Sequence, residues 1–127
     1  EAAERVGADE FIKKYDDELD LHVRERGAML SVGQRQLIAF MRAYVASPSI
    51  LILDEATSSI DSESEHLIQR ATSSITEGRT SLIVAHRLST IRDADRIFVI
   101  DSGALMESGT HEELLALEGV YHSSFFL

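Results

Sequence analysis

The chain has 127 residues, 44% of them apolar, and a formal net charge of −10 at pH 7. A chain of this length can bury one modest core, so we expect at most one domain. The acidic balance argues against nucleic acid or anionic lipid as the main partner, because both are bound through clustered cations. The absence of cysteine excludes disulfides and thiolate metal sites. No apolar run approaches the roughly 20 residues of a membrane helix.

The first 20 residues are strongly acidic, with eight carboxylates against three cations. This composition most simply predicts a solvated face, and a functional acidic patch is the alternative. Val6, Phe11 and Ile12 give the segment a weak helical periodicity. We therefore expect a helix around Glu1 to Lys14.

A second helix, from Val32 to Ala46, has a clearer pattern. One face carries apolar side chains at helical spacing, namely Leu37, Phe40, Met41 and Tyr44. Such a stripe indicates core packing rather than a cofactor contact. Pro48 ends the helix, because it disfavours the helical conformation at Ser47. Ser31 and Gln34 have the spacing of a capping box, and the first amides of such a helix favour a phosphate.

A run of branched apolar residues from Ile50 to Leu53 predicts a strand that is buried on both faces in a parallel sheet. Asp54 and Glu55 follow it directly. Residues just past the carboxyl end of such a strand lie where parallel sheets bind ligands. Both carboxylates are therefore candidates for an active site.

The remaining elements follow from caps, turns and short β-rich runs. In chain order we expect a helix from a capping box at 62–65 to about Gly78, strands at 80–85 and 96–101 separated by a helical turn at 88–92, a turn at 102–103, a strand at 104–107, and a last helix capped by Thr110 and Glu113. Strands that alternate with helices predict a mostly parallel α/β sheet with one hairpin.

Six segments resemble motifs of the ATP-binding cassette (ABC) family, in the family's order and spacing. Leu30 to Gln34, which reads LSVGQ, resembles the signature motif, and Ile50 to Glu55 resembles the Walker B strand with its catalytic glutamate. The other four are the segment before the signature at 25–27, the D-loop at 58–61, the switch-histidine segment at 83–87, and the C-terminal hairpin and helix at 101–113.

The family's phosphate-binding G-x-x-x-x-G-K-[ST] loop has no counterpart, since none of the seven glycines is followed by lysine. We therefore expect the C-terminal half of a nucleotide-binding domain, cut from a longer polypeptide. The resemblance implies a partial P-loop NTPase (RecA-like) fold that lacks the Walker A strand and loop. Residues 1–30 would end the helical subdomain and include the segment before the signature. Residues 31–127 would form the signature helix and the C-terminal part of the ATPase core.

In the family's sheet, the strand before that loop lies between the strands expected here at 80–85 and 96–101. Its absence leaves two apolar strand edges with unpaired amides and carbonyls, and such edges recruit other chains. We expect the chain to close this gap by rearranging its strands or by pairing with a second copy.

The resemblance implies roles for three residues near the strand ends. Asp54 would help to hold Mg²⁺, usually through a water, because this hard cation prefers oxygen ligands. Glu55 would act as general base or position the water that attacks the γ-phosphate, and His86 would be the switch histidine that contacts the same phosphate. The simpler alternatives are a turn residue for Asp54, a solvated carboxylate for Glu55 and a structural histidine.

Four residues of the signature, Ser31, Val32, Gly33 and Gln34, would bind ATP that is held by a different subunit. Val32 stands where the commonest signature has glycine, which marks a subtype and removes some backbone freedom. Asp61 in the D-loop would lie at the dimer interface and link the two ATP sites. Ser31 and Asp61 also suit a plain N-cap role.

The function implied is that of an ABC exporter, which hydrolyses Mg-ATP in a head-to-tail dimer to drive export. Its partners would be a second nucleotide-binding domain and transmembrane domains in the missing part, at the cytoplasmic face of the inner membrane, with no nucleic acid. The piece itself would be soluble and inactive as an ATPase. The alternatives are a soluble ABC ATPase of DNA-repair or chromosome-maintenance type and a noncatalytic ATP-gated dimerisation module. Arg35, Arg42 and Arg87 resemble the family pattern but also suit solvated helix cations.

Overall fold

The structure is a computed structural model that describes residues 1–54 and 62–126. Its contacts divide the chain into two compact units, Glu1–Ile83 and Val84–Leu127. Glu55 and Asp61, two of the predicted site residues, lie outside the described residues. Within the described ranges, no helix is long and apolar enough to cross a membrane.

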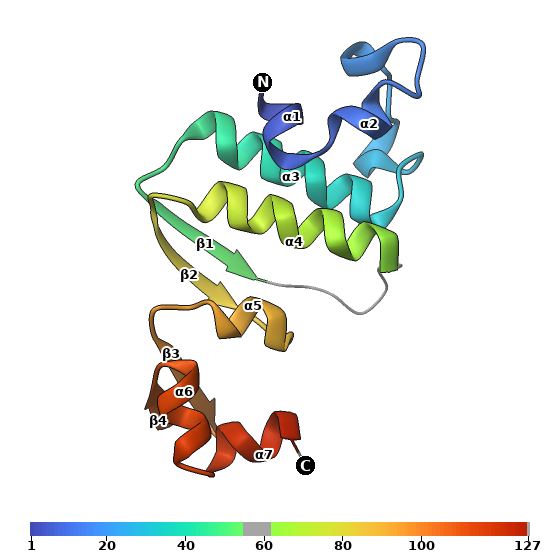
Figure 1. Ribbon diagram of the computed structural model, residues 1–127. Coiled ribbons are helices and arrows are strands. Elements are labelled where there is room, and N and C mark those ends of the chain that lie inside the picture. The colour runs from blue at the N-terminus through green and yellow to red at the C-terminus, as the bar shows by residue number, and fades with distance from the viewer. Residues whose placement is uncertain (55–61, 127) are drawn as a thin grey trace. The chain divides into compact units, whose positions relative to one another are not determined.

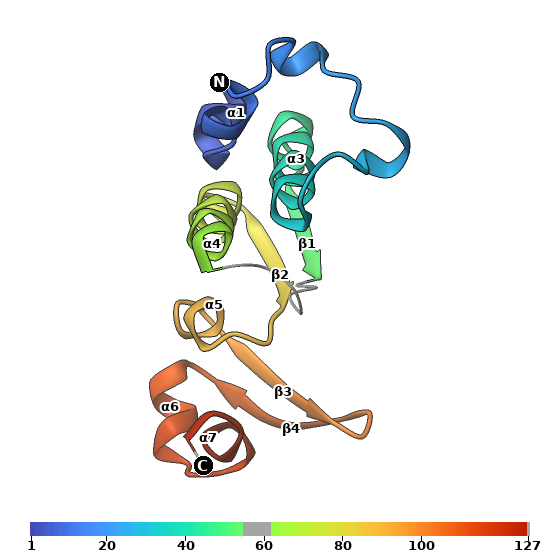
Figure 2. The same ribbon diagram turned by 90° about the vertical axis from the view of Figure 1, so that its right-hand side faces the viewer.

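The first unit is a small parallel sheet with helices. Its elements are α1 (Ala2–Val6), α2 (Asp9–Ile12), the 3₁₀ turns Glu18–Asp20 and Glu25–Gly27, α3 (Val32–Ala46), β1 (Ile50–Asp54), α4 (Ser62–Thr76) and β2 (Thr80–Val84). β1 and β2 pair and run in the same direction, with α4 between them in the chain (Figures 1 and 2). This βαβ arrangement confirms the parallel part of the predicted fold.

The core of this unit lies between the helices and one face of β1. α3 and α4 lie side by side, and α1 packs against both (Figures 1 and 2). The buried side chains are Val6, Ala8, Ile12, Leu37, Phe40, Leu51, Ile68, Ala71 and Ile75. The stripe predicted on α3 is confirmed, because Leu37 and Phe40 are buried and Met41 and Tyr44 pack against the same core.

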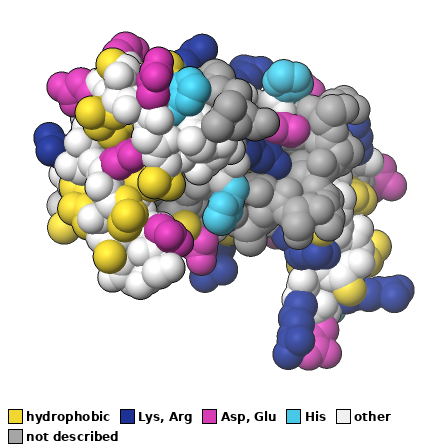
Figure 3. Space-filling model, turned by 90° about the horizontal axis from the view of Figure 1, so that it is seen from below, with side chains coloured by type: hydrophobic (Ala, Val, Ile, Leu, Met, Phe, Trp, Pro, Cys, Tyr) yellow, Lys and Arg dark blue, Asp and Glu magenta, His cyan; other side chains and the backbone are white. Residues whose placement is uncertain are grey.

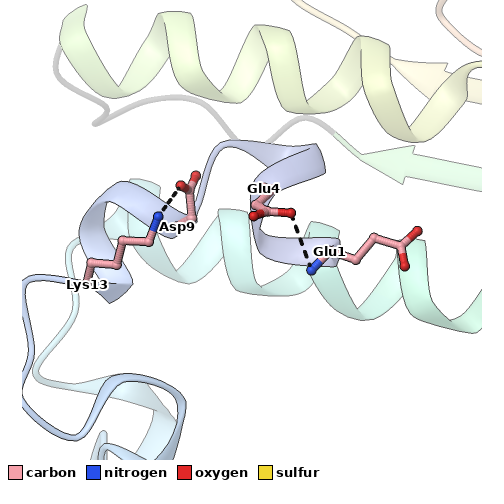
Figure 4. Close-up of polar contacts among 4 residues, drawn as sticks. All are labelled: Glu1, Glu4, Asp9 and Lys13. Atoms are coloured by element: carbon pink, nitrogen blue, oxygen red, sulfur yellow. Dashed lines mark hydrogen bonds and ion pairs between the residues drawn. The ribbon is translucent and has the colours of Figure 1, made fainter.

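The N-terminal segment does not form the single helix expected from Glu1 to Lys14. α1 ends at Val6, because Gly7 takes a left-handed conformation (φ 70°) that caps the helix and suits glycine best. In the following α2, Asp9 accepts a 3.0 Å hydrogen bond from Lys13, which lowers the pKa of Asp9 (Figure 4). Figure 3 shows one face of the molecule, on which acidic side chains lie among hydrophobic, basic and histidine side chains.

β1 is buried on one face only, so the prediction of two buried faces is wrong for this unit. Leu51 is buried and Leu53 packs against the helices, whereas Ile50 and Ile52 are 65% and 68% exposed. The reason is that the helices of the unit cover one side of the strand. Leu82 of β2 is also exposed. Sequence pattern alone cannot reveal whether a second layer is present.

Gly33, in the first turn of α3, is buried where α3 meets α4. A Cβ at this position would lie 2.8 Å from the Cβ of Ser64 and 3.1 Å from its hydroxyl oxygen. Real carbon atoms do not approach so closely, so the absence of a side chain at Gly33 allows the two helices to approach.

The second unit contains the predicted hairpin. Its elements are α5 (Leu88–Arg92), β3 (Ile97–Asp101), β4 (Ala104–Gly109), α6 (His111–Ala116) and α7 (Val120–Phe126). The two strands are antiparallel, with Ile97 opposite Gly109 and Asp101 opposite Ala104. Their connection, Ser102 and Gly103, has φ values of 50° and 78°, as a two-residue hairpin turn requires.

The strands of the two units form two separate two-stranded sheets, β1–β2 and β3–β4. Within the described part of the chain, no strand of one sheet pairs with a strand of the other. Closure of the expected gap, by rearranged strands or by a second copy, stays a prediction.

Helix α7, which has no predicted counterpart, is tied to β4 by Glu107. The Glu107 carboxylate accepts hydrogen bonds from the backbone N–H groups of Val120 (2.7 Å) and Tyr121 (3.0 Å). These amides have no partner within the helix, and the negative charge complements the helix dipole. Tyr121 is buried beside His111, 2.8 Å from oxygen to Nδ1, and burial raises the pKa of Tyr121.

Replacing Gly33 with Ala should lower the free energy of unfolding by about 1–3 kcal/mol, because the added methyl group overpacks the contact with Ser64. Adding Ser64→Gly to Gly33→Ala should recover most of this loss, although Ser64→Gly alone costs about 1 kcal/mol as a glycine within a helix. Urea unfolding of the parent protein, the two single variants and the double variant forms a double-mutant cycle. If Gly33→Ala lowers the free energy of unfolding equally with and without Ser64→Gly, Gly33 and Ser64 are not in contact.

Replacing Glu107 with Ala should destabilise the docking of α7 by about 1–2 kcal/mol, the usual cost of a lost helix cap. Glu112→Ala is the matched control, since its exposed carboxylate lies in the same unit and takes no part in the cap of α6, which Thr110 and Glu113 form. Amide hydrogen exchange at Val120 and Tyr121 should accelerate in the first variant and not in the second. Similar exchange rates in both variants would show that the cap does not hold α7.

Candidate functional site

The start of α3 carries four of the predicted site residues and is shaped by a reciprocal cap. The Ser31 hydroxyl oxygen accepts a hydrogen bond from the backbone N–H of Gln34 at 3.1 Å, and the Gln34 side-chain oxygen accepts one from the Ser31 N–H at 3.0 Å. This confirms the capping box expected from the spacing. The cap occupies an acceptor site of the Ser31 hydroxyl and leaves its proton available as a donor.

The environment of each residue decides what it can offer to a ligand. Ser31 and Val32 are exposed, Gln34 is half-buried and Gly33 is buried against α4. A phosphate could therefore reach the Ser31 hydroxyl and the amides at the helix start, where the dipole favours negative charge. Val32 adds an exposed apolar side chain beside them. Gly33 has a packing role whatever its contact with nucleotide.

Arg35 lies one turn into α3 and is exposed, but its guanidinium also contacts the backbone. Its Nη1 atom donates a 2.8 Å hydrogen bond to the carbonyl oxygen of Leu30 and makes a longer contact, 3.5 Å, with the carbonyl oxygen of Gly27. Sequence reasoning left this role open, because it depends on the backbone conformation of 24–30. The only signal in the sequence is Gly27 itself, which takes φ 69°.

Asp54 is the last residue of β1 and is exposed. An exposed carboxylate at a strand end is a suitable oxygen ligand for Mg²⁺. The described residues contain no group of three or more acidic or histidine side chains placed to hold a metal ion. Asp54 alone would therefore contribute one ligand, and phosphates and water would supply most of the others. Glu55, its neighbour, lies outside the described residues.

His86 lies two residues beyond the end of β2, within the second unit, and is exposed. The four signature residues are thus brought together at one helix start, while Asp54 ends β1 and His86 follows β2.

A hollow of about 300 Å³ opens between α1 and α4. Its lining consists of Arg5, Val6, Gly7, Leu67, Arg70, Ser73 and Ser74. None of the predicted site residues borders it, so the candidate site is an exposed surface at the start of α3 rather than this hollow.

Three comparisons with known proteins agree with each other. A family model described as ABC transporter matches residues 1–58. The ABC transporter ATP-binding protein YknV of Bacillus subtilis is 56% identical over 120 residues, which cover 94% of this chain and 20% of that protein. The ATP-dependent lipid A-core flippase of Salmonella typhimurium is 54% identical over 121 residues, which cover 95% of this chain and 21% of the flippase.

A solved structure, that of a bacterial Atm1-family ABC exporter with ATP bound, matches with a TM-score of 0.84 at 40% identity, over 98% of this chain and 22% of that one. The chain thus spans about a fifth of the length of the relatives that it matches. The matched stretches cover nearly all of its residues. The chain therefore belongs to the ABC transporter family and corresponds to a part of that family's ATP-binding domain.

Proposed function

We propose that this chain is part of the ATP-binding and hydrolysing domain of an ABC exporter, which couples Mg-ATP hydrolysis to the movement of a substrate across a membrane. The observation that carries the proposal is the start of α3, where an exposed Ser31 hydroxyl and the first helix amides form a surface for phosphate. The relatives support an exporter over a soluble DNA-repair ATPase, since one is named a flippase and another an exporter.

The resemblance to the family supports a nucleotide that is held by another domain. ATP would be held by the phosphate loop of one nucleotide-binding domain and closed over by the α3 start of a second one. This arrangement makes the active unit a head-to-tail dimer, identical or not, attached to transmembrane domains at the cytoplasmic face of the inner membrane.

Each predicted site residue then has a distinct task. Ser31, Val32, Gly33 and Gln34 would contact the phosphates of the partner's ATP, and Asp61 would lie at the interface between the two domains. Asp54 would hold Mg²⁺, which neutralises charge on the phosphates when bound. Glu55 would accept the proton of the attacking water, and His86 would hold the γ-phosphate in place.

In the full-length protein, Glu55→Gln should preserve ATP binding and lower the turnover number by about 10²- to 10⁴-fold, because the amide keeps the shape of the side chain but cannot accept a proton. Glu77→Gln, an exposed carboxylate after α4, is the control and should leave turnover unchanged. The two variants are compared by ATP hydrolysis and by nucleotide-binding affinity. An unchanged turnover in Glu55→Gln would mean that this site is not hydrolytic.

His86→Ala should abolish measurable hydrolysis with little change in melting temperature, because an exposed residue past a strand end contributes little to the core. His66→Ala, an exposed histidine on α4, should change neither quantity. If the melting temperature of His86→Ala falls together with its activity, His86 is a structural residue and its assignment to the phosphate is wrong.

A further inference from the structure

The peptide group between Leu30 and Ser31 is held at both of its ends by consecutive residues of α3. Its N–H donates to the Gln34 side-chain oxygen at 3.0 Å, and its carbonyl oxygen accepts from the Arg35 guanidinium at 2.8 Å. Because a peptide group is planar, two such bonds fix its rotation. They thereby also fix the direction in which Ser31 enters the helix.

The segment before this peptide has an unfavourable backbone conformation. Arg24 has φ 59° and ψ 179°, a region occupied almost only by glycine, and Arg26 has φ 55° and ψ 21°. Gly27 follows with φ 69°. Such conformations persist only where surrounding contacts hold them, so other parts of the chain must hold the segment 24–30 in place.

The Arg35 side chain provides such a contact. A Cβ on Gly27 would lie 3.2 Å from Cδ and 3.3 Å from Cγ of Arg35, so the side chain runs along the Gly27 backbone. Its guanidinium then reaches the carbonyl oxygens of Leu30 and, at 3.5 Å, of Gly27. Arg35 therefore joins the segment 24–30 to the first turn of α3.

The positive charge of Arg35 also bears on where its side chain lies. A cation in the first turn of a helix is disfavoured by the helix dipole. Here the positive charge is directed at backbone carbonyl oxygens, which carry partial negative charge. The structure gives Arg35 no contact with a carboxylate, so its hydrogen bonds in the described residues are to the backbone alone.

We propose that Arg35 is a positioning residue: by holding the Leu30–Ser31 peptide, it aims the Ser31 hydroxyl at the phosphates of the partner's ATP. This inference rests on the proposed function. Arg35 acts through Ser31 and makes no contact with nucleotide itself. Movement of the segment 24–30 would reach the ATP site through the Leu30–Ser31 peptide, which Arg35 and Gln34 hold.

The test uses the full-length transporter and four substitutions: Arg35→Ala, Arg35→Lys, Ser31→Ala, and the double variant of Ser31→Ala with Arg35→Ala. Arg42→Ala is the matched control, because Arg42 is exposed on the same helix and makes no hydrogen bond or ion pair within the described residues. ATP hydrolysis gives kcat and KM, and amide hydrogen exchange without nucleotide reports on the Ser31 N–H.

We expect Arg35→Ala to lower kcat by about 10- to 100-fold, the usual effect of a reacting group misplaced by about 1 Å, with nucleotide affinity and melting temperature nearly unchanged. Arg35→Lys should retain part of the activity, because its ammonium can still reach one carbonyl. The double variant should be no slower than Ser31→Ala alone, since Arg35 acts through Ser31. Exchange at Ser31 should accelerate in Arg35→Ala and not in Arg42→Ala.

Losses that multiply in the double variant would overturn the proposal, because they would show that Arg35 contributes independently of Ser31. Equal behaviour of Arg35→Ala and Arg42→Ala would overturn it too. If Arg35→Ala does not fold, Arg35→Gln is measured in its place with the same expectations. A parent protein without ATPase activity, or a Ser31→Ala variant with full activity, would instead refute the proposed function. In that case, amide hydrogen exchange at Ser31 still shows whether Arg35 holds the Leu30–Ser31 peptide.

Discussion

The close packing of α3 on α4 is the constraint on which the rest of the first unit depends. It is possible because Gly33 presents no side chain to Ser64, and it brings the start of the signature helix against the start of the helix that follows Walker B. α1 then packs on the pair, and Leu51 of β1 completes the core beneath them. Any change that separates the two helices would move the Ser31 surface and open the core together.

The polar contacts around Ser31 depend on that packing in turn. Gln34 and Arg35 hold the peptide before the helix only while α3 keeps its own position. The side chains that fix the site are thus supported by the contact of Gly33 with Ser64 in the same helical turn. The packing of the two helices holds α3 in place, and the hydrogen bonds of Gln34 and Arg35 set the direction of the peptide before it.

The features that the sequence could predict are those determined over a few residues. The caps at Ser31 and Thr110 were readable because each depends on a partner three residues away, and both are present. The hairpin turn at 102–103 is equally local. By contrast, the exposure of Ile50 and Ile52 depends on whether a second layer covers the strand, which no local pattern reports.

Two further differences between the expected and the observed structure have the same physical origin. The helix expected from Glu1 to Lys14 is broken because Gly7 adopts a left-handed conformation, a choice that glycine permits but does not require. The role of Arg35 depends on the path of the backbone at Gly27 and Leu30, which charge and spacing do not encode. The motif resemblance did point to the helix start, the strand ends and the family, since these depend on residue identity.

The two sheets also differ in how far apart their strands lie in the chain. β3 and β4 are joined by two residues, whereas β1 and β2 are separated by the whole of α4. The loop-closure entropy of the hairpin is small, and that of the parallel pair is paid before its contacts form. The hairpin should therefore assemble early during folding, while the aliphatic strands β1 and β2 wait for α4. During that delay the unpaired aliphatic strands are most prone to pair with other chains.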